Sequence, residues 1–166
     1  MGLFTFIKEA GEKLLGIGEA KATEEVAKKD PTPVNVDAAN KAAANAIAAY
    51  VAKMNLTAAG ITIGFDGASG TVIVQGMADT QETKEKILLC CGNVADVESV
   101  RDQLGVIQAE VEPQFYTVVR GDTLSKIALD FYGNANAYMG IFEANKPMLT
   151  HPDKIYLGQM LRIPPQ

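Results

Sequence analysis

The chain has 166 residues, and 48% of them are hydrophobic, which is enough to bury a core in one or two small domains. Its net charge is −5 and its sequence pI is about 4.9. This acidic balance argues against nucleic acid as a partner, because phosphate backbones repel an acidic surface, and it disfavours anionic membranes for the same reason.

The cysteines and the N-terminus both indicate a location inside the cell. Cys90 and Cys91 are adjacent and have no other cysteine to pair with, so they are expected to be free thiols, as in a reducing compartment. The first residues lack the basic leader of a signal peptide, Lys8 and Glu9 interrupt the apolar run, and no stretch is long enough to span a membrane. We therefore expect a cytoplasmic protein, with a non-classical export route left open.

The first 36 residues predict a docking helix followed by a tether. Residues 3–15 fit a short amphipathic helix, which is marginal in water alone and must dock on its own protein, a membrane or a partner. Residues 16–36 fit a tether that is transiently helical from Lys21 to Lys29 and is stopped by prolines. The apolar face of the expected helix contains Leu3, Ile7, Ala10 and Leu14.

A helix and a hairpin are predicted next. Asp37 can cap a helix that runs through Met54, with many alanines that favour helix formation and close packing. Ile61–Phe65 alternates like a strand, and Thr71–Gly76 reads as its partner. Residues 66–70 have the Asp, Gly and Ser content of a turn, so the two strands should form a hairpin.

A second helix and a third strand complete this middle segment. Asp79 and Glu82 form a capping box that starts a helix near Thr80, and Gly92 is expected to end it in the left-handed conformation. Val97–Leu104 then predicts a strand. The order helix, strand, strand, helix, strand predicts an α+β sandwich with its helices on one face of a small sheet.

The C-terminal segment, residues 115–166, predicts the order strand, helix, helix, strand. Tyr116–Val119 and Leu161–Ile163 are the expected strands, a first helix starts near Thr123, and a second covers Ala135–Asn145. Phe115–Ala128 and Ile155–Pro164 carry a resemblance to the LysM domain, a family whose usual ligand is the N-acetylglucosamine backbone of peptidoglycan or chitin.

The middle segment resembles a BON domain, through the hairpin Ile61–Gly76, the helix Asp79–Cys91 and the run Gly92–Val100. We therefore expect residues 1–36 to be the docking helix and tether, 37–107 a BON domain, 108–114 a linker and 115–166 a LysM domain. The expected fold class is α+β, a BON sandwich (αββαβ) followed by LysM (βααβ).

The whole arrangement resembles the bacterial BON–LysM family of potassium-binding proteins. Its most specific parts are Met1–Phe4, Ala10–Leu14, Lys84–Leu88, Gly92–Asn93 and Ile141–Leu149. The resemblance implies K⁺ as the ligand, held by the main-chain carbonyls of Ile7, Ala10, Gly92, Val94 and Asp96.

Such a site is physically sensible, because K⁺ is large and weakly hydrated, and neutral carbonyls can replace its water shell. The C-terminus of a helix offers such carbonyls at the negative end of its dipole. We expect K⁺ to pin the N-terminal helix to the BON domain and to compact BON against LysM, as suits a monomeric sensor or buffer. The motif itself has a plain alternative, in which Gly92 only caps a helix and Asp96 only turns a loop.

Two other functions stay open. The LysM resemblance implies peptidoglycan, or another protein, as a partner, and BON domains are often associated with membranes, for which the apolar N-terminal residues argue weakly. Leu157 replaces a proline usual in LysM, and Gly121–Thr123 can be only a turn and helix cap of the fold. We find no catalytic constellation around the single histidine, His151, and expect no enzyme activity. The expected sugar-binding residues are Gly121, Asp122, Thr123 and Leu124, facing Met148 and Leu149.

Overall fold

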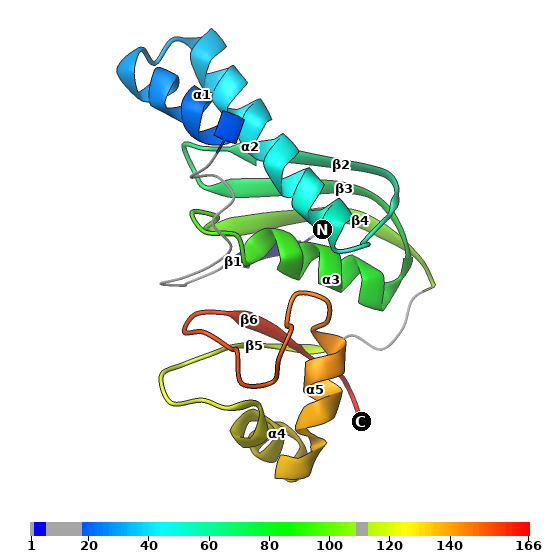
Figure 1. Cartoon of the computed structure of the whole chain (residues 1–166). Helices are drawn as coiled ribbons and strands as arrows, with labels where there is room; N and C mark the ends of the chain where they lie inside the picture. The colour runs from blue at the N-terminus through cyan, green and yellow to red at the C-terminus, as the bar shows by residue number, and fades with distance from the viewer. Residues whose placement is uncertain (1, 6–17, 109–112) are drawn as a thin grey trace.

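The computed structural model describes residues 2–5, 18–108 and 113–166 (Figure 1). Its elements form a four-stranded sheet with helices and a two-stranded sheet with helices, which confirms the predicted α+β class. The smaller, C-terminal unit lies beside one helix of the larger unit (Figure 1).

The larger sheet has the strand order β1-β4-β3-β2. β2 (Ala59–Asp66) and β3 (Thr71–Thr80) form the predicted antiparallel hairpin. α3 (Gln81–Gly92) then crosses over to β4 (Ser99–Gln108), which is parallel to β3. β1 (Gly2–Thr5) pairs antiparallel with the outer edge of β4.

Helices α2 (Pro33–Lys53) and α3 cover one face of this sheet, as Figure 1 shows. Alternate residues of a strand point to the same face, so Val72 and Val74 of β3 both face the helices and are fully buried. Ile47 of α2 and Ile87 of α3 pack in the same core. The α2–β2–β3–α3–β4 order is therefore the predicted sandwich.

The C-terminal unit has the predicted order of strand, helix, helix and strand. β5 (Gln114–Thr117) pairs antiparallel with β6 (Met160–Ile163), and α4 (Leu124–Tyr132) leads to α5 (Tyr138–Ala144) through a short 3-10 turn at Ala135–Ala137. Its buried core contains the five residues predicted for it, Leu124, Ile127, Ile141, Phe142 and Ile163.

The N-terminal prediction was wrong where it can be compared. Gly2–Thr5 is a strand rather than the start of a helix over 3–15, and residues 6–15 lie outside the described residues. Phe4 and Thr5 favour strands, and β4 offers an edge of unpaired backbone groups that a short segment can satisfy. The expected tether is also ordered from residue 18, because α1 (Gly18–Lys29) packs along α2 and projects with it beyond the sheet (Figure 1).

Two helix caps were misplaced. α2 starts at Pro33 with Thr32 as its N-cap, instead of at Asp37, because proline suits the first helical position and the Thr32 hydroxyl accepts a backbone bond. α3 is likewise capped by Thr80 and not by Asp79.

The end of α3 also differs from the prediction. Gly92 is its last helical residue, and Asn93 follows with φ −84°, so no left-handed glycine ends the helix. The left-handed residue of this region is Asp96, with φ 68°.

Candidate functional site

The bend of residues 93–98 links the C-terminus of α3 to β4. Gly92 and Val94 are buried, whereas Asp96 is exposed. The Val97 N–H donates to the Val94 carbonyl at 3.3 Å, and a carbonyl oxygen has two lone pairs, so this oxygen can accept a second contact. The structure thus places the predicted Gly92 at the end of α3 and Val94 and Asp96 in the bend that follows, while Ile7 and Ala10 lie outside its described residues.

One side of this bend rests on the β2–β3 turn. The carbonyl of Gly70 accepts hydrogen bonds from Glu98 N at 2.8 Å and from Ser99 N at 3.3 Å. Gly70 has φ 58°, and a Cβ added there would lie 3.1 Å from the Asp96 carbonyl oxygen. A side chain at this position would crowd the Asp96 carbonyl oxygen and strain the left-handed backbone, so glycine lets the turn pack closely against the bend.

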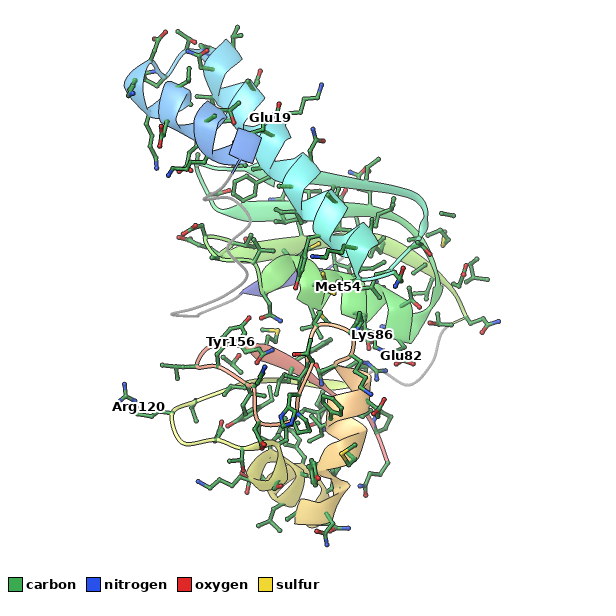
Figure 2. All side chains as sticks on the ribbon, in the orientation of Figure 1. Glu19, Met54, Glu82, Lys86, Arg120 and Tyr156 are labelled. Carbon is green, nitrogen blue, oxygen red and sulfur yellow. The ribbon has the colours of Figure 1, made fainter. Side chains whose placement is uncertain are left out.

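The other side of the bend is held by the C-terminal unit, through Asn93. The Asn93 Nδ2 donates to the Met160 carbonyl, and Met160 N donates to Asn93 Oδ1, both at 3.2 Å. The Tyr156 hydroxyl donates to the Asn93 carbonyl at 3.4 Å. Tyr156 is labelled in Figure 2 on the loop that faces the larger unit. The bend is therefore held between two elements far apart in the sequence.

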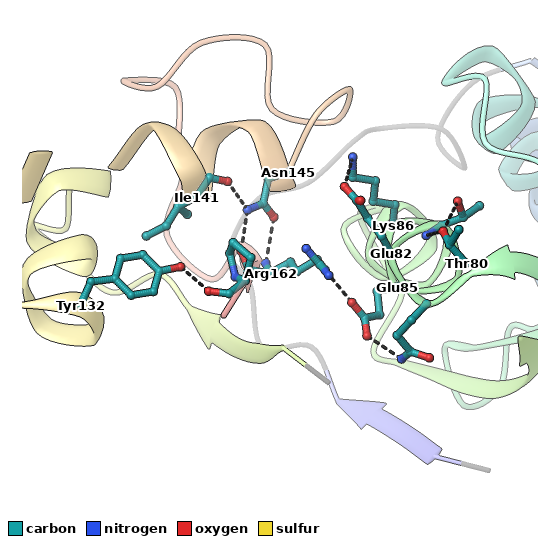
Figure 3. Close-up of polar contacts among 11 residues, drawn as sticks. Thr80, Glu82, Glu85, Lys86, Tyr132, Ile141, Asn145 and Arg162 are labelled. Atoms are coloured by element: carbon teal, nitrogen blue, oxygen red, sulfur yellow. Dashed lines mark hydrogen bonds and ion pairs between the residues drawn. The ribbon is translucent and has the colours of Figure 1, made fainter. Parts of the chain in front are cut away.

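A buried ion pair joins the same two units further along α3. Arg162 Nε donates to Glu85 Oε2 at 2.5 Å, and Gln81 Nε2 donates to the other oxygen of that carboxylate (Figure 3). Behind it, the Asn145 side chain bonds both the N–H and the carbonyl of Arg162 at 2.8 Å. These bonds fix β6 against α3, with Met160 two residues from Arg162 on the same strand.

A cavity of about 330 Å³ reaches the bend from the side of α1 and α2. Asp96 lies on its wall, together with Phe65 and Gly67 of the hairpin. The Glu24–Lys28 ion pair also lines it, and its hydrogen bond raises the pKa of the Lys28 ammonium. The cavity offers a solvent route to the exposed end of the bend.

The donor set at this bend fits a large monovalent cation. The last carbonyls of α3 carry the negative end of the helix dipole, which favours a cation near Gly92. No group of three or more His, Cys, Asp or Glu side chains that could hold a metal ion occurs in the described part of the chain. The bend offers neutral main-chain oxygens, which can replace the water shell of K⁺, beside the exposed side chains of Asp96 and Glu98.

The predicted sugar-binding residues mostly have structural contacts. The Asp122 carboxylate accepts from Tyr116 Oη and from Val119 N, both at 2.8 Å. Thr123 is the N-cap of α4, as predicted, and Leu124 belongs to the core. Of the remaining three, Gly121 is exposed, Leu149 is in the C-terminal core, and Met148 packs against the core of the larger unit.

Three residues of this arrangement could not be assigned a role from the sequence. The sequence predicts only a turn at Gly70, and it predicts no contact for Asn93 or Tyr156. Glycines in a turn can be flagged for close approach, but Asn93 and its partners are more than sixty residues apart in the chain. No local pattern signals such contacts.

Comparison with known proteins places the chain in a class and then in a family. The family model of the LysM domain matches residues 116–164, so the C-terminal unit is a LysM domain and the protein is a mixed α+β protein that carries one. The chain is 44% identical over 165 residues to the potassium binding protein Kbp of Escherichia coli O6:H1, with 99% of each chain covered. It therefore belongs to the family of that protein.

Two more relatives share only part of the chain. Esterase Rv1288 of Mycobacterium tuberculosis is 37% identical over 81 residues, which cover 48% of this chain and 16% of the esterase. An uncharacterized protein of Deinococcus radiodurans is 49% identical over 49 residues, which cover 30% and 19% of the two chains. Among the described helices, none has the length and apolar character needed to cross a membrane.

Proposed function

We propose that this protein binds K⁺ through main-chain carbonyls and works in the cytoplasm as a monomeric K⁺ sensor or buffer, without enzyme activity. The observation that carries the proposal is the full-length similarity to a protein named for potassium binding. The carbonyl-rich bend after α3 supplies a chemically suitable place. The proposed ligands are the carbonyls of Ile7, Ala10, Gly92, Val94 and Asp96.

The pairing of β1 supports a contribution from the N-terminal segment. Thr5 pairs with Ser99, which is three residues past Asp96 in the chain. β1 is antiparallel to β4, so it ends at Thr5 beside the start of β4, next to the bend that precedes that strand.

Binding would act by mass action. A ligand present at about 100 times its Kd stabilises the bound state by roughly 2.7 kcal/mol. We propose that this free energy holds the segment after β1 on the α2–β2–β3–α3–β4 unit, which we take to be a BON domain, and tightens the contact with LysM. The protein would then become more compact as K⁺ rises.

Calorimetric titration of the purified chain with K⁺, Na⁺ and Mg²⁺ tests the proposal, with small-angle scattering in parallel. We expect heat and a smaller radius of gyration with K⁺ only. An equal response to Na⁺, or no heat with K⁺, would reject it.

Paired variants at Asp96 separate main-chain from side-chain binding. Asp96→Gly keeps the left-handed backbone and the carbonyl but removes the carboxylate, so K⁺ affinity should stay within about threefold. Asp96→Val forces a branched side chain into a conformation that costs about 1–2 kcal/mol, so the affinity should fall about tenfold or more. A large loss in Asp96→Gly would assign the ion to the carboxylate instead.

A second candidate is peptidoglycan binding, favoured by the LysM match over residues 116–164. The sugar would contact Gly121, Asp122, Thr123 and Leu124 on one side and Met148 and Leu149 on the other. Co-sedimentation of the chain with purified peptidoglycan, with and without K⁺, tests this. Recovery in the pellet, together with a periplasmic location on cell fractionation, would favour this function over the first.

A further inference from the structure

Within the described residues, Asn93 joins the bend to the LysM domain by a reciprocal side-chain contact with Met160. It is 8% exposed and lies between Gly92 and Val94, two of the proposed ligands. Its amide both donates to and accepts from the backbone of Met160, as a further strand residue would. Both polar atoms of the Asn93 side-chain amide are held by Met160, which restricts the backbone of Asn93. That backbone lies between the proposed ligand carbonyls of Gly92 and Val94.

The contact of Tyr156 points to the same role. Its hydroxyl donates to the carbonyl of Asn93, which is the oxygen between those of Gly92 and Val94. A carbonyl that accepts this hydrogen bond is turned toward the LysM domain. Together with the bond from the Val94 N–H to the Cys91 carbonyl at 3.3 Å, this contact fixes the peptide plane between Asn93 and Val94, directly after the Gly92 carbonyl.

The ion pair beside it fixes the strand that carries the Asn93 partner. Arg162 bonds Glu85, and Glu85 lies eight residues before Asn93, or about 12 Å along a helix. β6 thus touches α3 at the helix body through Arg162 and at the helix end through Met160. Only the second contact reaches the bend.

We propose that Asn93 is the positioning residue through which the LysM domain orients the K⁺-binding carbonyls of the bend. Ion binding and LysM docking are then thermodynamically coupled, and each increases the equilibrium constant of the other by the same factor. This inference rests on the proposed K⁺ binding, and the LysM domain enters it as part of the ion site instead of as a separate module.

The test uses the full-length chain, titrated calorimetrically with K⁺ and Na⁺. Asn93→Ala leaves both Met160 groups without their partner, so we expect K⁺ affinity to fall about tenfold and the preference for K⁺ over Na⁺ to narrow. Asn45→Ala, on the exposed face of α2, is the matched control and should change neither. Tyr156→Phe should weaken K⁺ binding by a smaller factor in the same direction.

The wild-type chain gives an independent measurement that needs no folded variant. Since Met160 N–H donates to Asn93, K⁺ should slow hydrogen exchange of the Met160 amide more than that of Leu161, by a factor that Na⁺ does not produce. Wild-type affinity and selectivity in folded Asn93→Ala would overturn the inference, as would K⁺-independent exchange at Met160. A wild-type chain that binds no K⁺ would instead overturn the proposed function.

Discussion

The buried ion pair between α3 and β6 allows a quantitative test of how the two units hold together. The side chains of Glu85 and Arg162 are 3% and 7% exposed, and Gln81 completes the hydrogen bonds of the carboxylate. We consider Arg162→Met, Glu85→Leu and the double variant. Each single change leaves a charge buried without its partner, whereas the double change removes both charges.

The expected sizes follow from that asymmetry. Breaking one side of a buried pair typically costs about 3–5 kcal/mol, while replacing both partners by apolar groups is often neutral. The two single losses should therefore not add, and the coupling free energy should reach about 3 kcal/mol or more. The exposed pair Glu24–Lys28, at 46% and 72% exposure, is the control, and its removal should leave the unfolding midpoint close to that of the wild type.

Urea unfolding in K⁺-free buffer measures these free energies, because the proposed ligand is then absent. With a slope of about 1–3 kcal/mol per molar urea, a loss of 3–5 kcal/mol lowers the midpoint by roughly 1 M or more. Because the pair is buried, salt should change the result little. Additive single losses, or an Arg162→Met loss below about 1 kcal/mol, would show that the pair does not fasten β6 to α3.

Three further outcomes are expected. Gly70→Ala should cost about 1–2 kcal/mol in urea unfolding, because of its left-handed backbone, and should weaken K⁺ binding in calorimetry, because its Cβ would crowd the Asp96 carbonyl; unchanged K⁺ affinity would separate the turn from the site. Burial, helped by its hydrogen bond to a carboxylate, raises the pKa of Tyr116 from 10.0 to about 12. The folded state therefore keeps a proton that the unfolded state releases, so stability present below pH 10 is lost as the pH rises toward 12, and Tyr116→Phe should flatten that decline in unfolding experiments from pH 9 to 12. Burial also raises the pKa of the Cys91 thiol, so a thiol reagent should react with Cys90 and Cys91 only as fast as the fold opens, and K⁺ should slow that reaction.

The elements that could be predicted have their signal in adjacent residues. The β2–β3 hairpin follows from alternating side chains around a Gly-rich turn, and the LysM order follows from apolar spacing. β1 was not predicted because a strand of four residues forms only by pairing with β4, which lies almost a hundred residues away in the sequence. The stable helix α1 was not predicted because its composition is mostly polar. Its packing on α2 is visible only in the folded structure.

The candidate site could be predicted only in part from the sequence, for the same reason. Carbonyl ligands leave almost no trace in residue type, so Gly92, Val94 and Asp96 could be proposed only through resemblance. The bonds of Asn93 to Met160 and of the Gly70 carbonyl to Glu98 join segments distant in sequence. Such pairings become visible once the fold has brought the segments together.

Under the proposed K⁺ binding, the contacts of Gly70 and Asn93 with the bend would contribute to ion selectivity. Na⁺ is smaller than K⁺, and in the size-based account of selectivity a loop of neutral carbonyls favours K⁺ when it resists contraction around the smaller ion. A free bend of this length could contract, because each backbone bond rotates at little cost. Gly70 limits the movement of the Asp96 carbonyl from the sheet side, and Asn93 limits that of Gly92 and Val94 from the LysM side. Loosening either support should therefore lower the ratio of K⁺ to Na⁺ affinity, even where some K⁺ binding survives.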